Sequence, residues 1–114
     1  MVADSGGLKM TAKQFRKLVL SLPDAVESEH MGHPDFRVGG KIFATLNFEE
    51  SFCVLMLTPE QQEEWLKREP DRFVLCKGAW GLRGCTHVEL KTATAATLRQ
   101  ALKMAWKNKA PKKS

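Results

Sequence analysis

The sequence predicts an α+β domain with an antiparallel sheet of about five to six strands, N- and C-terminal helices packed on one face, and a short central helix. Three observations predict this class. Apolar residues recur at helical spacing near both ends of the chain, glycine turns separate strand-like segments between them, and one helix start interrupts those strands. The 114 residues suffice for one core, so we expect a single domain at 11–110, a flexible tail at 1–10 and a basic tail at 111–114.

The first helix is expected over residues 11–22. Thr11 and Gln14 have the spacing of a capping box, in which the two residues satisfy each other's free backbone N–H groups. Pro23 marks the end, because the residue before a proline is pushed out of helical geometry. The apolar face contains Phe15, Leu18, Val19 and Leu22, and the outer face contains Lys13, Arg16 and Lys17.

A short edge strand at residues 25–30, with Val26 facing the core, is expected to precede a three-stranded antiparallel meander. Gly39 and Gly40 separate the first two strands of the meander, and glycine readily adopts the positive φ that a two-residue hairpin turn needs. Alternation places Phe36 and Val38 toward the core before the turn. After the turn, the core-facing residues are expected to be Ile42, Ala44 and Leu46. The apolar run 51–57 supplies the third strand.

The central helix starts at Thr58 and ends before Pro70. Thr58 and Gln61 repeat the capping-box spacing, and Pro59 occupies the first helical position, where proline is favoured. Trp65 is one of only two main apolar residues, so this helix should be short and pack at an edge of the sheet.

A second hairpin and a final helix complete the chain. Residues 73–76 and 86–90 are expected to be strands on either side of a glycine-rich loop at 78–84. The last helix should run from Thr94 to about Lys109, because Leu98, Ala101, Leu102, Ala105 and Trp106 recur at its spacing.

The net charge of +5 is unevenly distributed, with +3 over residues 1–22, −6 over 23–75 and +8 over 76–114. This asymmetry indicates contact with a polyanion or a solvated basic tail. Three cysteines without a CxxC pair argue against a disulfide framework, and we expect each to pack rather than react. The sequence has no apolar run of about 20 residues and no secretory signal, so we expect a cytoplasmic protein that does not enter membranes.

Two stretches carry a family resemblance. His33-Pro34, Phe36-Arg37-Val38 and the run from Gly40 to Ala44 lie in the first, and Trp80-Gly81 lies in the second. With these motifs the chain resembles the MmcQ/YjbR family of small bacterial proteins over about residues 15–111. The resemblance implies a frataxin-like (CyaY-like) sandwich and DNA binding through a double-wing arrangement. Cys85 departs from the family, whose members often carry tryptophan at that position.

The resemblance implies a set of nucleic-acid-binding residues in the two hairpins: Arg37, Lys41, Lys77, Trp80 and Arg83. The charge pattern adds a basic face on the two terminal helices, represented by Lys103 and Lys107. Phosphate contacts position a protein without specifying sequence, so we expect weak, largely non-specific binding of nucleic acid, with duplex DNA favoured over RNA. The expected protein is a monomer without enzymatic activity or cofactor.

The sequence offers other candidate sites. Metal binding at His30 and His33 is disfavoured, because the first helix exposes cations and four closed ligands are not evident. Cys85 and His87 would share one face of a strand, but the sequence supplies no acid partner or oxyanion turn for catalysis. Trp80 either stacks on a base or covers the sheet edge. The main alternative is a protein or small-molecule binding module that uses the sheet face or the Trp80 loop, with a pocket near Trp80 or His33.

Overall fold

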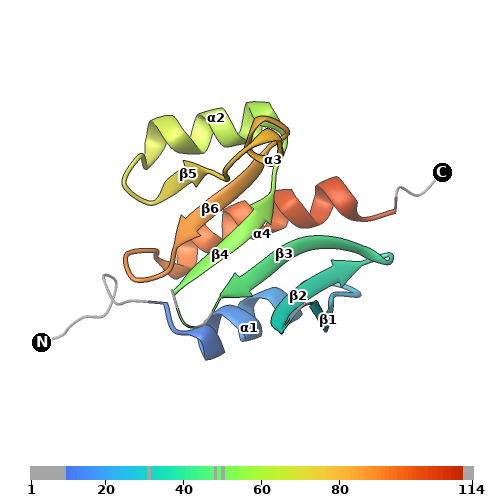
Figure 1. The fold of residues 1–114 in the computed structure, drawn as a ribbon. Helices are drawn as coiled ribbons and strands as arrows, with labels where there is room; N and C mark the ends of the chain where they lie inside the picture. The colour runs from blue at the N-terminus through green and yellow to red at the C-terminus, as the bar shows by residue number, and fades with distance from the viewer. Residues whose placement is uncertain (1–9, 31, 48, 50, 112–114) are drawn as a thin grey trace, which may run out of the picture.

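The computed structural model is an α+β domain built on one six-stranded antiparallel sheet (Figure 1). It describes residues 10–30, 32–47, 49 and 51–111, with side-chain detail from all of these except His30. The strands are β1 (Val26–His30), β2 (His33–Val38), β3 (Lys41–Asn47), β4 (Phe52–Met56), β5 (Phe73–Leu75) and β6 (Cys85–Glu89). The helices are α1 (Ala12–Leu20), α2 (Pro59–Arg68), α3 (Ala79–Leu82) and α4 (Ala95–Lys109). The predicted fold class is confirmed.

The strand order in the sheet is β1-β2-β3-β4-β6-β5, so β6 lies between β4 and β5. The chain leaves β4, forms α2, returns as the edge strand β5, and then inserts β6 beside β4. This order makes two units of the sheet: the meander β1 to β4 and the hairpin of β5 and β6.

The core lies between one face of the sheet and the terminal helices, which pack side by side (Figure 1). Phe15 of α1 meets Phe36 of β2 edge to face, with 5.7 Å between ring centroids. At the other end of the core, Trp65 of α2 stacks on Phe73 of β5 at 4.9 Å and donates its indole N–H to Met104 of α4. We call this side of the sheet the helix side and the opposite side the open face.

The expected caps and turn are present. Thr11 with Gln14 and Thr58 with Gln61 each form a complete capping box, so both helices begin where the sequence predicts. Gly39 and Gly40 have φ values of 59° and 80°, which is the left-handed geometry of a two-residue hairpin turn. The last helix ends at Lys109, as its spacing predicts.

Two predicted orientations are wrong. Val26 is 56% exposed, because it stands opposite Arg37 on the open face, whereas Glu27 points to the helix side and pairs with Arg16. A bulge between β2 and β3 shifts the alternation, so that Phe43 is buried and Ile42 turns toward the open face. A bulge adds one residue to one strand, and a strict two-residue alternation does not detect it.

Other boundaries also differ from expectation. The loop expected at 78–84 contains the one-turn helix α3. Met10 is buried and its N–H donates to the Leu90 carbonyl, so the packed domain includes the last residue of the expected N-terminal tail. Residues 1–9 and 112–114, which make up most of the two expected tails, lie outside the described residues. In the described part of the chain, no helix has the length and apolar character needed to span a membrane.

Candidate functional site

The two hairpins place their connections at the same end of the sheet. Met56, the last residue of β4, pairs with Cys85, the first residue of β6, so the β5–β6 loop lies where β4 ends. The Gly39-Gly40 turn lies at this end as well, because β2 and β3 run alongside β4 in the antiparallel register. Figure 1 shows the β2–β3 turn at the right and the β5–β6 connection, with α3, at the top.

The C-terminus of α4 reaches the same end. The Asn108 side chain donates to the Met56 carbonyl at 3.0 Å. A Cβ placed on Gly39 would lie 2.7 Å from Cγ of Pro111, so the hairpin turn touches the segment that follows α4. Cations from three separate stretches therefore gather at this end, which we call the basic end: Lys41, Lys77, Arg83, Lys107 and Lys109.

The cations of the basic end are available to a partner. None of the five forms an ion pair with any residue that the structure describes. Trp80, in α3, is 65% exposed, and the guanidinium carbon of Arg83 lies 5.9 Å from its ring centroid. Trp80 therefore does not fold back over the sheet edge, one of the two positions considered for it.

The loop that carries Trp80 is held by close backbone contacts. Gly78 has a φ of 74° ahead of α3, and a Cβ on Gly81 would collide with the Cys76 carbonyl oxygen. The amide of Gln62 donates from α2 to the Gly81 carbonyl at 3.0 Å. These contacts fix α3 against α2 and β6, so the exposed indole is held on a supported turn.

Arg37 differs from the other residues proposed from the hairpins. It lies within β2 on the open face, and its guanidinium makes two hydrogen bonds to the Asp35 carboxylate, at 2.9 and 3.2 Å. The hydrogen bond and the charge of Asp35 raise the pKa of Arg37. Asp35 is only 1% exposed, so its carboxylate is held close to the sheet. The charge of Arg37 is therefore compensated, and its side chain lies along the sheet and not at the hairpin turn.

The expected basic face of the terminal helices meets the basic end only at Lys107. Lys103 and Lys107 are exposed on α4, and α1 packs alongside that helix, as expected. Arg16 of α1 is bound to Glu27 at 2.7 Å, which compensates part of the expected basic face. Lys107 belongs to the basic end, whereas Lys103 lies about 6 Å further back along the helix axis at 1.5 Å per residue.

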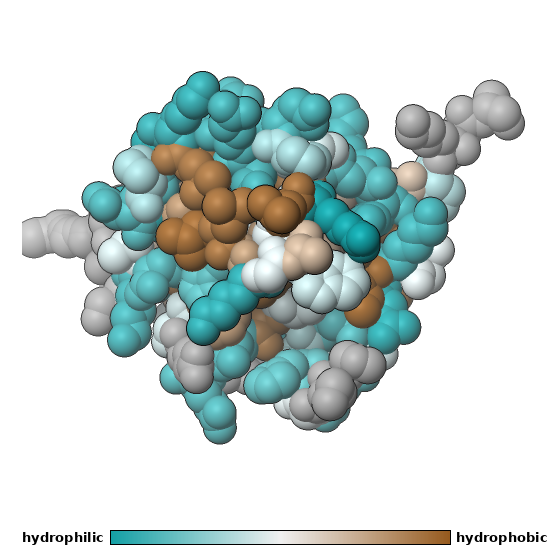
Figure 2. All heavy atoms as spheres, turned by 45° about the horizontal axis from the view of Figure 1, so that its top comes forward, coloured by the Kyte–Doolittle hydropathy of each residue, from teal (hydrophilic) through white to brown (hydrophobic). Residues whose placement is uncertain are grey.

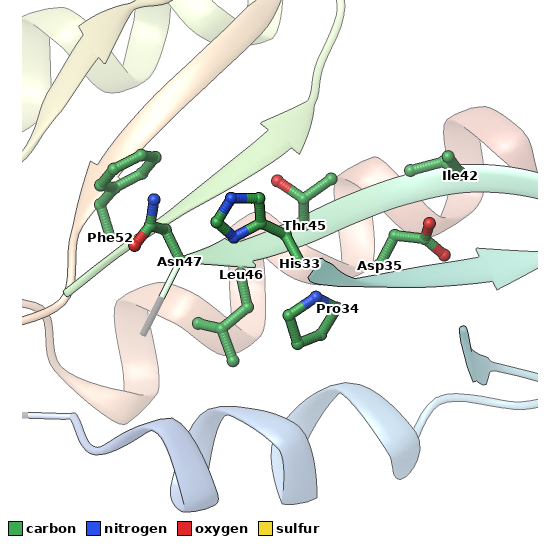
Figure 3. A pocket seen from close by; sticks show the side chains of 8 residues that line it. All are labelled: His33, Pro34, Asp35, Ile42, Thr45, Leu46, Asn47 and Phe52. Carbon is green, nitrogen blue, oxygen red and sulfur yellow. The ribbon is translucent and has the colours of Figure 1, made fainter. Parts of the chain in front are cut away.

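The open face contains a hollow of about 280 Å³ (Figure 3). His33, Thr45 and Phe52 point into it from three neighbouring strands, and its lining is mostly apolar. Phe52 also stacks on His87, with ring centroids 4.1 Å apart. The hollow is near His33, one of the two places at which a pocket was expected for a small-molecule binding module.

Exposed apolar side chains also lie on β5 and α3, around the Trp80 loop. Figure 2 shows apolar residues gathered on one face, with hydrophilic residues around them. The most exposed large apolar side chains near this loop come from β5 and α3: Val74, Leu75, Trp80 and Leu82. This apolar area was not identified from the sequence, although the apolar run at residues 73–75 in an edge strand is a signal for it.

Cys85 and His87 share the open face, as alternation predicts, but each has another neighbour. The Cys85 sulfur lies 2.7 Å from the Cys76 sulfur, and the His87 ring stacks on Phe52. Sequence reasoning did not bring Cys76 and Cys85 together. No group of three or more potential metal ligands occurs in the described part of the chain, and the side chain of His30 lies outside it.

These features define a small α+β domain whose sheet has helices on one face and two loops with uncompensated cations at one end. The sequence model of the YjbR family matches residues 20–108, so the chain belongs to that family. Among solved structures, it is similar to Deinococcus radiodurans protein DR2400, described as a DUF419 domain. The TM-score is 0.73 and the identity 20%, over 86% of this chain and 77% of that chain, which establishes the fold. No curated protein matches this chain.

Proposed function

We propose that the protein is a non-enzymatic, monomeric, cytoplasmic nucleic-acid-binding protein that contacts the phosphates of duplex DNA with its basic end. The observation that carries this proposal is the gathering of five cations from three separate stretches, without an ion-pair partner among the described residues. Phosphate contacts supply most of non-specific binding, and uncompensated cations provide them.

The spacing of the two connections suits a duplex. The β2–β3 turn and the β5–β6 loop are separated by three strand spacings, which is about 14 Å at the usual spacing in a sheet. This is close to the width of the DNA major groove, about 12 Å, so the two connections can reach phosphates on either side of that groove. Such an arrangement agrees with the double-wing DNA binding that the family resemblance implies.

Trp80 gives the basic end an aromatic contact. An exposed indole beside a guanidinium group can stack on an unpaired base or lie against sugar groups, and neither contact reads the base sequence. Recognition helices and zinc-binding motifs are not evident from the sequence, so we infer weak binding with little sequence preference.

Fluorescence anisotropy of a labelled random-sequence duplex, measured at several salt concentrations, tests this proposal. We expect binding at low salt, with a slope of log K against log salt near −0.9 for each phosphate contacted. Lys41→Ala combined with Arg83→Ala should reduce the steepness of this slope by about 1.8, equally for different duplex sequences. A flat slope, or no binding at low salt, would contradict the proposal.

Two matched variants serve as comparisons. Lys67→Ala with Arg68→Ala removes the same charge from α2, where both cations pair with glutamates, and should leave the slope nearly unchanged. Arg99→Ala with Lys103→Ala removes the same amount of charge from the middle of α4. If only this second variant weakens binding, the helical face is the contact surface and the assignment to the basic end is wrong.

The hollow on the open face supports a second candidate, the binding of a small, mostly apolar molecule. Its volume of about 280 Å³ is near the lower limit of ordinary ligand pockets, about 300 Å³, and His33 and Asn47 supply polar groups at its wall. Screening of small molecules by protein NMR would test it. Shifts confined to these strands, lost in a Thr45→Trp variant that fills the hollow, would support this candidate.

A further inference from the structure

Two of the three cysteines stand opposite each other in the second hairpin. The register pairs Leu75 with Thr86, so Cys76 is directly opposite Cys85, and the Cys76 N–H donates to the Cys85 carbonyl at 3.1 Å. Opposed residues of antiparallel strands have Cα atoms about 4.5 to 5.5 Å apart, within the range of about 4.4 to 6.8 Å found for disulfide-bonded cysteines. The two sulfur atoms already lie 2.7 Å apart.

The environment favours reaction at this pair over the third cysteine. Both thiols are partly exposed on the open face, next to the loop that carries Trp80. The hydrogen bond between the two sulfur atoms lowers the pKa of Cys85 and raises the pKa of Cys76. Cys53 is fully buried in the core, so reagents do not reach it. Burial also raises its pKa, so the reactive thiolate is disfavoured.

We propose that Cys76 and Cys85 form a redox-active pair, which closes reversibly into a disulfide by exchange with a small disulfide such as oxidised glutathione. The inference goes beyond nucleic-acid binding and does not rest on it. Structural disulfides are rare in reducing compartments, whereas transient redox-sensing disulfides occur there, and a partly exposed pair fits the second kind.

The exchange takes place in two steps. The Cys85 thiolate attacks one sulfur of the small disulfide, forms a mixed disulfide, and releases the other half as a thiolate. Cys76 then loses its proton to solvent and attacks the Cys85 sulfur, which releases the second half as a thiolate. Two electrons pass from the two cysteine sulfurs to the oxidant, one sulfur–sulfur bond is broken in the oxidant, and one is formed in the protein.

The disulfide would close a ring over residues 76–85. This ring contains α3 and three residues proposed for nucleic-acid contact: Lys77, Trp80 and Arg83. Closure ties the end of β5 to β6 and limits how far this loop can open from the sheet. The redox state of the pair therefore sets the freedom of one of the two loops of the basic end.

Equilibration of the whole protein in glutathione buffers of increasing oxidised fraction tests the proposal. The thiols are then trapped with a maleimide in denaturant, and the intact mass and peptides are measured. We expect the oxidised protein to take up one maleimide, at Cys53, to have lost two hydrogen atoms, and to yield a linked Cys76–Cys85 peptide. Three alkylated thiols in every buffer, or a glutathione adduct that persists on the wild-type protein, would overturn the proposal.

Variants test that both thiols are needed. Cys76→Ser should accumulate the mixed disulfide at Cys85, because the second thiol is absent, and neither Cys76→Ser nor Cys85→Ser should yield a linked peptide. Cys53→Ala is the matched control and should still form the linked peptide. Maleimide labelling of the native wild-type protein, mapped by peptide, tests the assignment of Cys85 as the attacking thiol: faster labelling of Cys85 supports the assignment, and equal labelling overturns it.

Discussion

Replacement of Gln62 by leucine tests how α2 is fastened to the second hairpin. Gln62 is buried, and its amide nitrogen lies 3.0 Å from three oxygens, of Gly81, Cys85 and Thr86. The amide has two hydrogens, so at least one of them is shared between two acceptors. Gln62→Leu keeps a side chain of similar size but removes all of these hydrogen bonds.

The remaining partners of these acceptors limit the cost. The Gly81 carbonyl also accepts from the Gly84 N–H, the Cys85 carbonyl also accepts from the Cys76 N–H, and the Thr86 hydroxyl donates to the Gly84 carbonyl. None of the three oxygens is left wholly unpaired in the variant, so the loss should be the net contribution of two hydrogen bonds, about 1 to 3 kcal/mol. At about 4 °C per kcal/mol for a domain of this size, Tm should fall by about 4 to 12 °C.

Urea unfolding followed by tryptophan fluorescence, together with thermal unfolding, measures this loss. Gln100→Leu makes the same substitution at an exposed position of α4 and should change the free energy of unfolding by less than about 0.5 kcal/mol. The reasoning is refuted if Gln62→Leu is as stable as Gln100→Leu. A loss well above about 3 kcal/mol would show that the other partners do not compensate the three oxygens.

Three further outcomes are expected. Gly84→Ala should lose about 3 to 5 kcal/mol of stability in denaturant unfolding, because φ is 110° and a Cβ would collide with the Leu57 carbonyl, whereas Gly32→Ala, with open space around it, should lose about 1 to 2 kcal/mol. In a thiol titration with a chromogenic disulfide, Cys53 should react only after unfolding, and its reaction in the native protein would show that the core opens readily. Thr58→Ala should cost about 1 kcal/mol by loss of the α2 cap, and an effect no larger than that of the exposed Thr92→Ala would contradict the assigned capping box.

The elements with strong local signals were predictable from the sequence. The two threonine caps, the Gly39-Gly40 turn and the apolar spacing of the last helix each depend on residues close together in the chain, and all appear as expected. The family motifs also identified the family correctly, and with it the fold class.

Features that depend on how one strand pairs with another were not predictable. The predicted orientation of β1 depended on one apolar residue, Val26. The register with β2 pairs Val26 with Arg37 and so places Val26 on the open face. The bulge that turns Phe43 inward is a property of a strand pair, and alternation within one strand does not reveal it. The Cys76–Cys85 contact depends on the register of the β5–β6 hairpin, which the sequence does not specify because the loop between these strands is long.

In the candidate site, the sequence identified every cation of the basic end except Lys109, but it did not identify the ion-pair partner of Arg37. Lys41, Lys77 and Arg83 are exposed as expected, whereas the charge of Arg37 is compensated by Asp35. A signal for that pair was present, because residues two apart on a strand share a face. Exposure, in contrast, depends on the tertiary fold, and Trp80 could not be assigned to solvent until its loop was placed.

The insertion of β6 has a consequence for synthesis on the ribosome. The meander of β1 to β4 emerges first, and its last strand, Phe52–Met56, then presents a mostly apolar edge whose partner is still to be translated. Strand β5 emerges next without a sheet neighbour of its own, since it pairs with β6 alone. A nascent chain that stalls before residue 85 therefore displays an unpaired strand edge of the kind that recruits other chains into aggregates or is shielded by chaperones.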